Sequence, residues 1–171
     1  MPVPIILRIP ALGINAAVLG VGVNDYDVMS APEGPRGDPV WQAAYWYRGS
    51  AVPGVRSTAL IAGHVNGPQG SAALFGHLDE LRAGDIVVVH DTRTGLDVRF
   101  AVTRTESFTL AQTTEPAVLR RIYGVGPVAG TTPQTSTDGL AHLTLMTCSG
   151  TFQRGLGTHD RRLAVFATRT A

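Results

Sequence analysis

The most informative segment of the chain is Leu143-Thr144-Leu145-Met146-Thr147-Cys148-Ser149-Gly150. An apolar run with β-strand character ends here in Cys148, and a glycine-containing segment follows at once. The pattern predicts a strand that presents a cysteine at its end, on a rigid element beside a mobile loop, where a side chain can meet a substrate. Cys148 is the only cysteine, which excludes an internal disulfide and a multi-cysteine zinc site. It is therefore either a small buried apolar residue or a reactive thiol.

The rest of the chain repeats this pattern of short apolar runs separated by Gly, Pro, Asn and Asp. The predicted strands are residues 5–9, 17–23, 57–64, 86–90, 96–108, 140–147 and 163–168. Leucines at helical spacing predict a short helix over 71–81, and Pro116 suits the first turn of a second helix over 116–123. Residues 30–55 are rich in proline and indicate a long surface connection, pinned to the core by its aromatic side chains. We expect a mostly-β fold, a closed barrel of about seven to nine strands with one or two short helices.

Composition narrows the function classes. The chain has 171 residues, 44% of them hydrophobic, and a net charge of +1, which predicts a single domain over 1–171 without a nucleic-acid surface or a polybasic membrane patch. All 14 positively charged residues are arginine, so no lysine is present to donate an isopeptide bond. No run approaches the roughly 20 apolar residues of a membrane span, and the start Met1-Pro2-Val3-Pro4 lacks the basic region of a signal peptide. We expect no metal and no cofactor.

Two further segments carry residues that can assist a thiolate. His64 follows the strongly apolar strand predicted over 57–64, and Arg161 and Arg162 begin the last strand. Antiparallel neighbours place the end of one strand beside the start of the next, so this arginine pair is expected near Cys148. Because side chains alternate along a strand, only one of the two arginines faces such a site. The residues alone leave a cysteine–histidine enzyme and a purely structural role open. The four other histidines, at positions 77, 90, 142 and 159, are interpreted as structural, with His159 nearest the rim of the site.

In this order the segments resemble the motifs of the sortase family. The likeness extends from about residue 5 to residue 168. The matching segments are 7–14 (Leu-Arg-Ile-Pro-Ala-Leu-Gly-Ile), 45–47 (Tyr-Trp-Tyr), 53–54 (Pro-Gly), 59–66 (Ala-Leu-Ile-Ala-Gly-His-Val-Asn), 73–86, 143–148 and 161–165 (Arg-Arg-Leu-Ala-Val). Gly150 and Phe152 after the cysteine resemble the class F or class E groups, whereas Asp160 stands where some class F members have an arginine.

The resemblance implies roles for these residues. Cys148 is expected to attack the Thr carbonyl of an LPXTG-type sorting peptide, and His64 to act as the acid and base. Arg162, or Arg161 as the alternative, is expected to hold the substrate backbone and stabilise the oxyanion. Thr147 and Asn66 are the expected substrate contacts.

The resemblance also implies partners and a location. The acyl acceptor is expected to be an amine, from a cell-wall precursor or a pilin lysine, or else water. Family members lie on the outer face of the bacterial cytoplasmic membrane, held by an N-terminal anchor that we interpret as missing from this chain. We expect a monomer.

Two other interpretations were weighed. An L,D-type transpeptidase usually has a Ser-His-Gly-Cys loop with Arg two residues after the cysteine, whereas Cys148 is followed by Ser149-Gly150. A β-barrel binding module, derived from a sortase without activity, fits the composition equally well. The presence of all three catalytic residue types at matching positions favours the enzyme.

Overall fold

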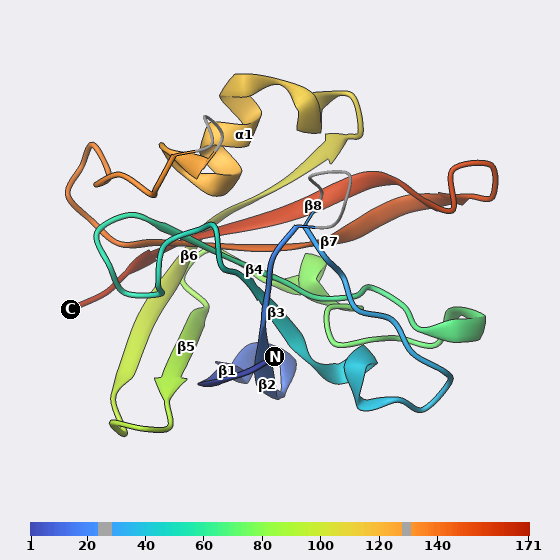
Figure 1. Ribbon diagram of the computed structural model, residues 1–171, viewed down its shortest axis with the longest axis horizontal. Helices are drawn as coiled ribbons and strands as arrows, with labels where there is room; N and C mark the ends of the chain where they lie inside the picture. The colour runs from blue at the N-terminus through green and yellow to red at the C-terminus, as the bar shows by residue number, and fades with distance from the viewer. Residues whose placement is uncertain (24–28, 128–130) are drawn as a thin grey trace.

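The computed structural model describes residues 1–23, 29–127 and 131–171, and its centre is a closed β-barrel (Figure 1). The order of strands around the barrel is β1-β2-β3-β4-β7-β8-β6-β5, with β5 pairing back to β1. Two neighbouring pairs, β2 with β3 and β4 with β7, are parallel, and the other six are antiparallel. The strands are β1 (Pro2–Ile9), β2 (Ile14–Val21), β3 (Ala44–Tyr47), β4 (Thr58–Ala62), β5 (Ile86–Asp91), β6 (Asp97–Thr109), β7 (His142–Gln153) and β8 (Thr158–Arg169). The expected barrel of about seven to nine strands is thus confirmed.

The helical elements are short. The α-helix α1 (Pro116–Tyr123) begins at Pro116, whose missing N–H is no loss in a first turn. Its C-terminal end is followed by Gly124, whose N–H donates to the Arg120 carbonyl. The described residues also form five short 3₁₀ turns: η1 (Pro10–Leu12), η2 (Pro39–Gln42), η3 (Pro68–Gly70), η4 (Leu78–Glu80) and η5 (Gln112–Thr114). The helix predicted over 116–123 is confirmed.

The barrel interior is filled by alternate residues of the strands. On β7 the inward side chains are Leu143 and Leu145, and on β8 they are Leu163, Val165 and Ala167. Phe75 and Phe100 are fully buried in the same cluster. Burying a side chain of this size stabilises the fold by about 1.5–3 kcal/mol. Because alternate residues point outward, His142, Thr144, Met146 and Cys148 share the outer face of β7.

That outer face is organised in rungs across three strands. The register aligns Thr58, His142 and Thr168 in one rung, Leu60, Thr144 and Phe166 in the next, and Ala62, Met146 and Ala164 in the third. Helix α1 covers the middle of the face, where its Val118 and Ile122 pack on Leu60 and Ala164. A fourth rung, with Cys148 opposite Arg162, lies beyond the third.

Two sequence-based expectations are wrong. Residues 71–81 form consecutive tight turns with η4 at their end instead of an α-helix, because Phe75, Leu78 and Leu81 are all buried at a spacing of three. The bonds that define these turns join residues three apart: Gly76 to Ala73, Leu78 to Phe75 and Glu80 to His77.

The second correction concerns the position of Cys148, which is inside a strand and not at its end. Strand β7 continues to Gln153, and the register with β8 shifts between Ser149 and Phe152. Gly150 adopts φ +74° there, a value that glycine tolerates and most residues avoid. The glycine after the cysteine therefore makes a β-bulge in a long hairpin, which reaches beyond the barrel (Figure 1).

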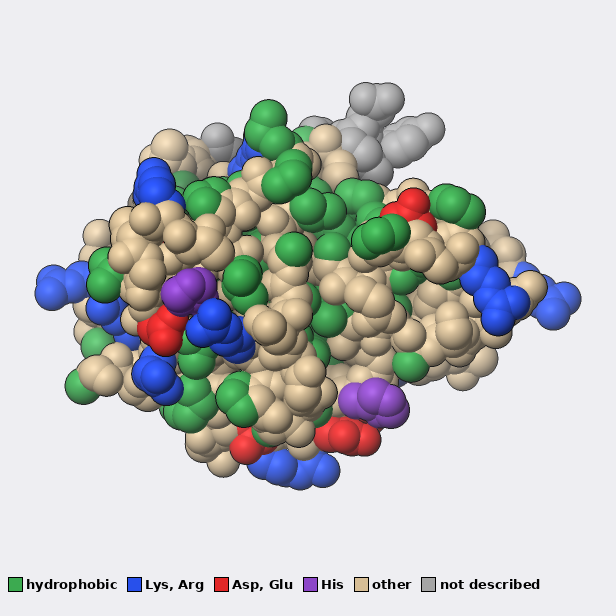
Figure 2. Space-filling view, turned by 90° about the horizontal axis from the view of Figure 1, so that it is seen from below, with side chains coloured by type: hydrophobic (Ala, Val, Ile, Leu, Met, Phe, Trp, Pro, Cys, Tyr) green, Lys and Arg blue, Asp and Glu red, His purple; other side chains and the backbone are tan. Residues whose placement is uncertain are grey.

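The surface carries charges of both signs. On the face that Figure 2 shows, arginine side chains lie at separate places with acidic side chains between them, in keeping with the net charge of +1. None of the helices in the described parts of the chain has the length and hydropathy that a membrane crossing requires.

Candidate active site

A cleft of about 790 Å³ lies at the end of the outer face where β4, β7 and β8 meet. His64, Cys148 and Arg162 all line it, so the structure brings these three sequence-predicted residues together. Two other parts of the chain complete the cleft. Residues 29–34 form one wall, and side chains of the 110–123 segment form another.

Cys148 and Arg162 are held opposite each other by the antiparallel pairing of β7 and β8. The Arg162 guanidinium donates to the carbonyls of His159 at 3.0 Å and Arg161 at 2.9 Å, and to the Thr158 hydroxyl at 3.1 Å. A guanidinium has five N–H donors. Three of them are engaged in these bonds, which fix the side chain on the hairpin backbone. The other two donors have no partner among the described residues and remain for a ligand.

Arg161 points elsewhere. Its register partner is Ser149, and its guanidinium donates to the hydroxyl of Ser107 at 2.8 Å and to the Ser107 carbonyl at 3.3 Å. These contacts turn the side chain over β6 and away from the cleft that Cys148 lines. Of the two arginines left open by the sequence, Arg162 is the one beside the cysteine.

The His64 imidazole is held by two aromatic rings and one carbonyl. Trp41 packs at 4.7 Å between ring centroids and Tyr45 at 5.5 Å, edge-on. Its Nε2 lies 2.8 Å from the Pro32 carbonyl oxygen, which can only accept a hydrogen bond, so Nε2 carries a proton in this arrangement. In the neutral ring the lone pair is then on Nδ1.

The placement of His64 depends on the residue before it. The Gly63 N–H donates to the Met146 carbonyl at 3.1 Å, extending the parallel pairing of β4 and β7 by one step toward Cys148. The Thr147 hydroxyl donates to the Gly63 carbonyl at 2.8 Å. Phe75 fills the space on the other side, since a Cβ on Gly63 would lie 2.7 Å from its ring. Only glycine fits between this ring and the strand.

The two residues expected to contact substrate differ in their surroundings. Thr147 is buried, and its side chain points to the inside of the barrel, where its hydroxyl bonds Gly63. Thr147 also lines the cleft, so its expected contact with substrate stays a prediction beside this positioning contact with Gly63. Asn66 lines the cleft, and its Oδ1 is buried without a hydrogen-bond partner among the described residues. That oxygen is an acceptor without a partner in the wall of the cleft.

Tyrosines of the cleft stay protonated near neutral pH. Burial, and to a smaller degree Asp38, raises the pKa of Tyr45 to about 12. Its hydroxyl donates to the Val40 carbonyl. Burial, followed by the nearby Tyr47, also raises the pKa of Tyr123. Neither phenol is therefore suited to accept a proton in the neutral range.

A comparison with models of protein families identifies the family of this chain. The family model described as "Sortase domain" matches residues 7–170, which is nearly the whole chain. The chain belongs to the sortase family. A search of curated proteins finds no significant match.

Solved sortases share the fold of this sortase domain. Sortase C-1 from Actinomyces oris superposes with a TM-score of 0.64 at 17% identity, over 100% of this chain and 76% of that one. A lid mutant of sortase A from Corynebacterium diphtheriae gives a TM-score of 0.63 at 16% identity, over 100% of this chain and 72% of that one. At sequence identities of 16–17%, these structural matches show a shared fold.

Several features of the sortase cleft were not predicted from the sequence. The Pro32 carbonyl is a backbone group, which no residue type announces. Of the aromatic side chains expected to pin the 30–55 connection to the core, Tyr45 is buried in a core cluster, and both Tyr45 and Trp41 pack on His64. His159 lines the cleft, where Phe152 packs edge-on against it at 5.4 Å.

Among the described residues, no three His, Cys, Asp or Glu side chains gather as a metal site would require.

Proposed function

We propose that this chain is a cysteine transpeptidase that cleaves an LPXTG-type sorting signal between its Thr and Gly residues and transfers the acyl group to an amine or to water. The observation that carries the proposal is the fourth rung of the outer face. Cys148 faces Arg162 across β7 and β8. The last pair between β4 and β7 joins Ala62 to Met146, and His64 and Cys148 each lie two residues beyond that pair, in the same cleft. We further propose that residues 1–171 act as one catalytic domain.

The first half of the reaction forms a thioester. The Cys148 thiolate attacks the Thr carbonyl carbon, and the carbonyl π electrons move to oxygen, where the two remaining Arg162 N–H donors stabilise the negative charge. The intermediate collapses as the C–N bond to glycine breaks. His64, as the imidazolium, donates its proton to that leaving amine. The acyl group is then bound to Cys148, and the glycine fragment departs.

The second half reverses these roles. An incoming amine attacks the thioester carbonyl, and His64, now neutral, accepts its proton. Collapse of the second tetrahedral intermediate forms the new amide and releases the Cys148 thiolate. Water in place of the amine gives hydrolysis by the same steps. The amine is proposed to come from a cell-wall precursor or a pilin lysine.

The walls of the cleft suit an extended peptide with an apolar first residue. Leu110, Leu119 and Ile122 give the 110–123 side an apolar surface. On the other side, Asn66 Oδ1 is available to accept a backbone N–H of the peptide. Burial of an apolar side chain together with a few polar contacts is the usual basis of specificity in such clefts.

The finer class and the location are proposals as well. Gly150 and Phe152 favour a class E or class F relation, whereas the solved structures reported above carry class A and class C names. With identities of 16–17%, these names do not decide the class of this chain. We propose that the enzyme acts on the outer face of the cytoplasmic membrane, on the sorting peptides of surface proteins.

The proposal is tested by mass spectrometry of the purified chain with an LPXTG-type peptide, with and without triglycine as the amine. Cleavage between Thr and Gly, a transpeptidation product with triglycine, and a thioester adduct on Cys148 are expected. Cys148→Ala must abolish all three. A library with varied first residues covers a different sorting motif. If no peptide is cut by any route, the inactive binding module becomes the better interpretation and the roles of Cys148, His64 and Arg162 are withdrawn.

A further inference from the structure

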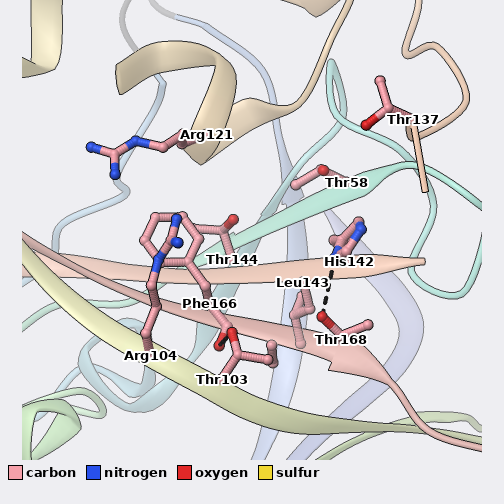
Figure 3. Close-up of a pocket in the computed structure, with 11 residues that line it drawn as sticks. Thr58, Thr103, Arg104, Arg121, Thr137, His142, Leu143, Thr144, Phe166 and Thr168 are labelled. Carbon is pink, nitrogen blue, oxygen red and sulfur yellow. Dashed lines mark hydrogen bonds between the residues drawn. The ribbon is translucent and has the colours of Figure 1, made fainter. Parts of the chain in front are cut away.

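A second cavity, of about 430 Å³, lies on the same outer face at the end away from Cys148 (Figure 3). Its floor is made by the first two rungs of that face, from Thr58 on β4 to Phe166 and Thr168 on β8. The third rung lies between the two, with Ala164 buried under α1 and with Ala62 and Met146 lining the catalytic cleft. None of the proposed catalytic residues lines this cavity, so it is a distinct feature of the fold.

The floor holds a buried hydroxyl without a partner. Thr144 is 1% exposed, and its Oγ1 has no hydrogen-bond partner among the described residues. Leaving such a group unpaired away from water is unfavourable. An apolar residue would avoid that loss, as Leu60 does beside it in the same rung. Thr144 lines the cavity beside Phe166, so its hydroxyl is placed to pair with a ligand (Figure 3).

The cavity also carries an excess of positive charge. Arg104 on β6 and Arg121 on α1 line it together, and both contact one carboxylate, Glu106, at 3.7 Å and 2.9 Å. Two guanidinium groups share a single negative charge. The Arg104 guanidinium carbon also lies over the Phe166 ring, 4.7 Å from its centroid, a cation–π contact that does not use the N–H donors.

The remaining polar groups suit an oxygen ligand. His142 at the far side is tied to the Asp138 carboxylate at 2.9 Å and to the Thr168 hydroxyl at 3.2 Å. Backbone donation from Leu140 and the contact with His142 keep the pKa of Asp138 below its usual range, so the Asp138 carboxylate is negatively charged near neutral pH and holds the His142 ring in place. The hydroxyls of Thr58 and Thr137 face the same space (Figure 3).

We propose that this cavity is a binding site for a small molecule bearing a phosphate or carboxylate group, held by Arg104, Arg121 and the Thr144 hydroxyl. Guanidinium groups pair with both oxyanions in the same two-pronged geometry, so the shared chemistry is the oxyanion. Two arginines exclude a metal cation, and the threonine hydroxyls disfavour a wholly apolar ligand. The volume is at the lower end of small-molecule sites, which suits a compact ligand. The site does not depend on the proposed reaction.

The test is isothermal titration of the full chain with inorganic phosphate and, separately, with succinate, at an ionic strength held constant with chloride. One site is expected for at least one of the two anions. Arg104→Gln and Thr144→Val should each weaken binding about tenfold, the value of one charge-assisted or buried hydrogen bond. The matched control is Arg93→Gln, which removes the same charge from a side chain that is 75% exposed in the β5–β6 turn and should leave the affinity unchanged.

The outcomes separate the ligand classes and expose an error. Phosphate binding alone assigns a phosphorylated ligand, and succinate binding alone assigns a carboxylate. Binding of neither anion at millimolar concentration overturns the proposal, as does a loss in Arg93→Gln equal to that in Arg104→Gln, because general surface charge then explains the result. Thr144→Val supplies an independent check in thermal unfolding without anion. A melting temperature equal to or above the wild type is expected, and a clear decrease means that the hydroxyl is already paired in the protein and that the site is not built for a ligand.

Discussion

Cys148 and Arg162 are direct partners across the antiparallel pair β7–β8, whereas Arg161 is the partner of Ser149. Opposed residues of an antiparallel pair project to the same face of the sheet. The pairing therefore puts the Arg162 guanidinium on the cysteine side, and three hydrogen bonds to the hairpin hold it there. Strand geometry, more than any property of arginine, distinguishes two adjacent and chemically identical side chains.

Substitution of each arginine separately is expected to give unequal effects. Arg162→Ala should lower kcat/KM for peptide cleavage by about two orders of magnitude or more, since it removes the donors proposed to stabilise the oxyanion. Arg161→Ala should change kcat/KM only a few-fold, because this side chain bonds Ser107 outside the cleft. Steady-state cleavage of a quenched fluorescent peptide measures both. An equal loss in the two variants would contradict the assignment of Arg162 alone.

Asn66 offers a different signature. Asn66→Ala should lower kcat/KM about tenfold, mainly through a higher KM, if its Oδ1 accepts a backbone N–H of the peptide. The same change should not reduce the melting temperature, because the atom that it deletes is buried without a partner among the described residues. Loss of activity together with loss of stability would instead indicate a structural role.

Thr147 is expected to act through Gly63. Thr147→Val keeps the shape of the side chain but deletes the donor to the buried Gly63 carbonyl, which should lower the free energy of unfolding by about 1–3 kcal/mol. His64 follows Gly63 directly, so kcat should fall as well. Urea unfolding and cleavage assays measure the two effects.

Thr147→Ser supplies the control for that prediction, because it keeps the hydroxyl and loses one methyl group. Activity close to the wild type is expected, with a modest decrease in stability of about 0.8 kcal/mol for the lost methyl. If Thr147→Ser is as inactive as Thr147→Val, the hydrogen bond to Gly63 is not what positions His64.

The comparison of sequence and structure shows where local patterns suffice. The apolar runs predicted most of the barrel because each strand buries alternate residues. The family motifs predicted that His64 and Cys148 share a site, and both residues line one cleft. The alternation of side chains along a strand predicted that only one of the two arginines faces Cys148. It could not say which, because the register depends on the pairing along the whole hairpin, including the bulge at Gly150.

Other features depend on tertiary contacts that no local pattern encodes. The leucines of 71–81 fit a helix, yet Gly76 in the segment disfavours one, and burial of Phe75 beside Gly63 selects tight turns. The Pro32 carbonyl meets His64 from 32 residues away. The second cavity joins Arg104, Arg121 and Thr144 from three elements, and their sequence positions gave no sign of this proximity.

Tyr45 should make the stability of the fold depend on pH only in the alkaline range. Its pKa of about 12 in the folded protein exceeds the ordinary value of 10.0, so the fold favours the protonated phenol. This contribution to stability is fully present below the ordinary pKa and is lost as pH rises from about 10 to about 12. Tyr45→Phe should therefore show a smaller decrease in unfolding free energy over that range, measured by urea unfolding at several pH values.

In the neutral range Tyr45 does not titrate, so Tyr45→Phe should leave the pH dependence of cleavage unchanged even if the rate itself decreases. The slope of stability between about pH 10 and 12 will not vanish in the variant, since Tyr123 also has a raised pKa. An altered pH–rate profile near neutrality would mean that the phenol takes part in proton transfer.

Gly63 provides the sharpest test of how the barrel core positions the catalytic histidine. In Gly63→Ala the new Cβ would meet the Phe75 ring at 2.7 Å, a contact that forces either the ring or the backbone to move. Because Phe75 is fully buried, we expect the free energy of unfolding to decrease by about 1–3 kcal/mol and kcat/KM to decrease with it. Gly22→Ala is the matched control, since a Cβ there has no atom within 4 Å.

The double variant Gly63→Ala with Phe75→Leu separates crowding from any other effect of the alanine. A smaller side chain at position 75 leaves room for the new Cβ, so the loss of stability in the double variant should be less than the sum of the two single losses. Partial recovery of kcat/KM relative to Gly63→Ala alone would show that the ring acts on His64 through the backbone of Gly63. Additive losses in stability, without recovery of cleavage, would mean that position 63 requires glycine for a reason other than its contact with Phe75.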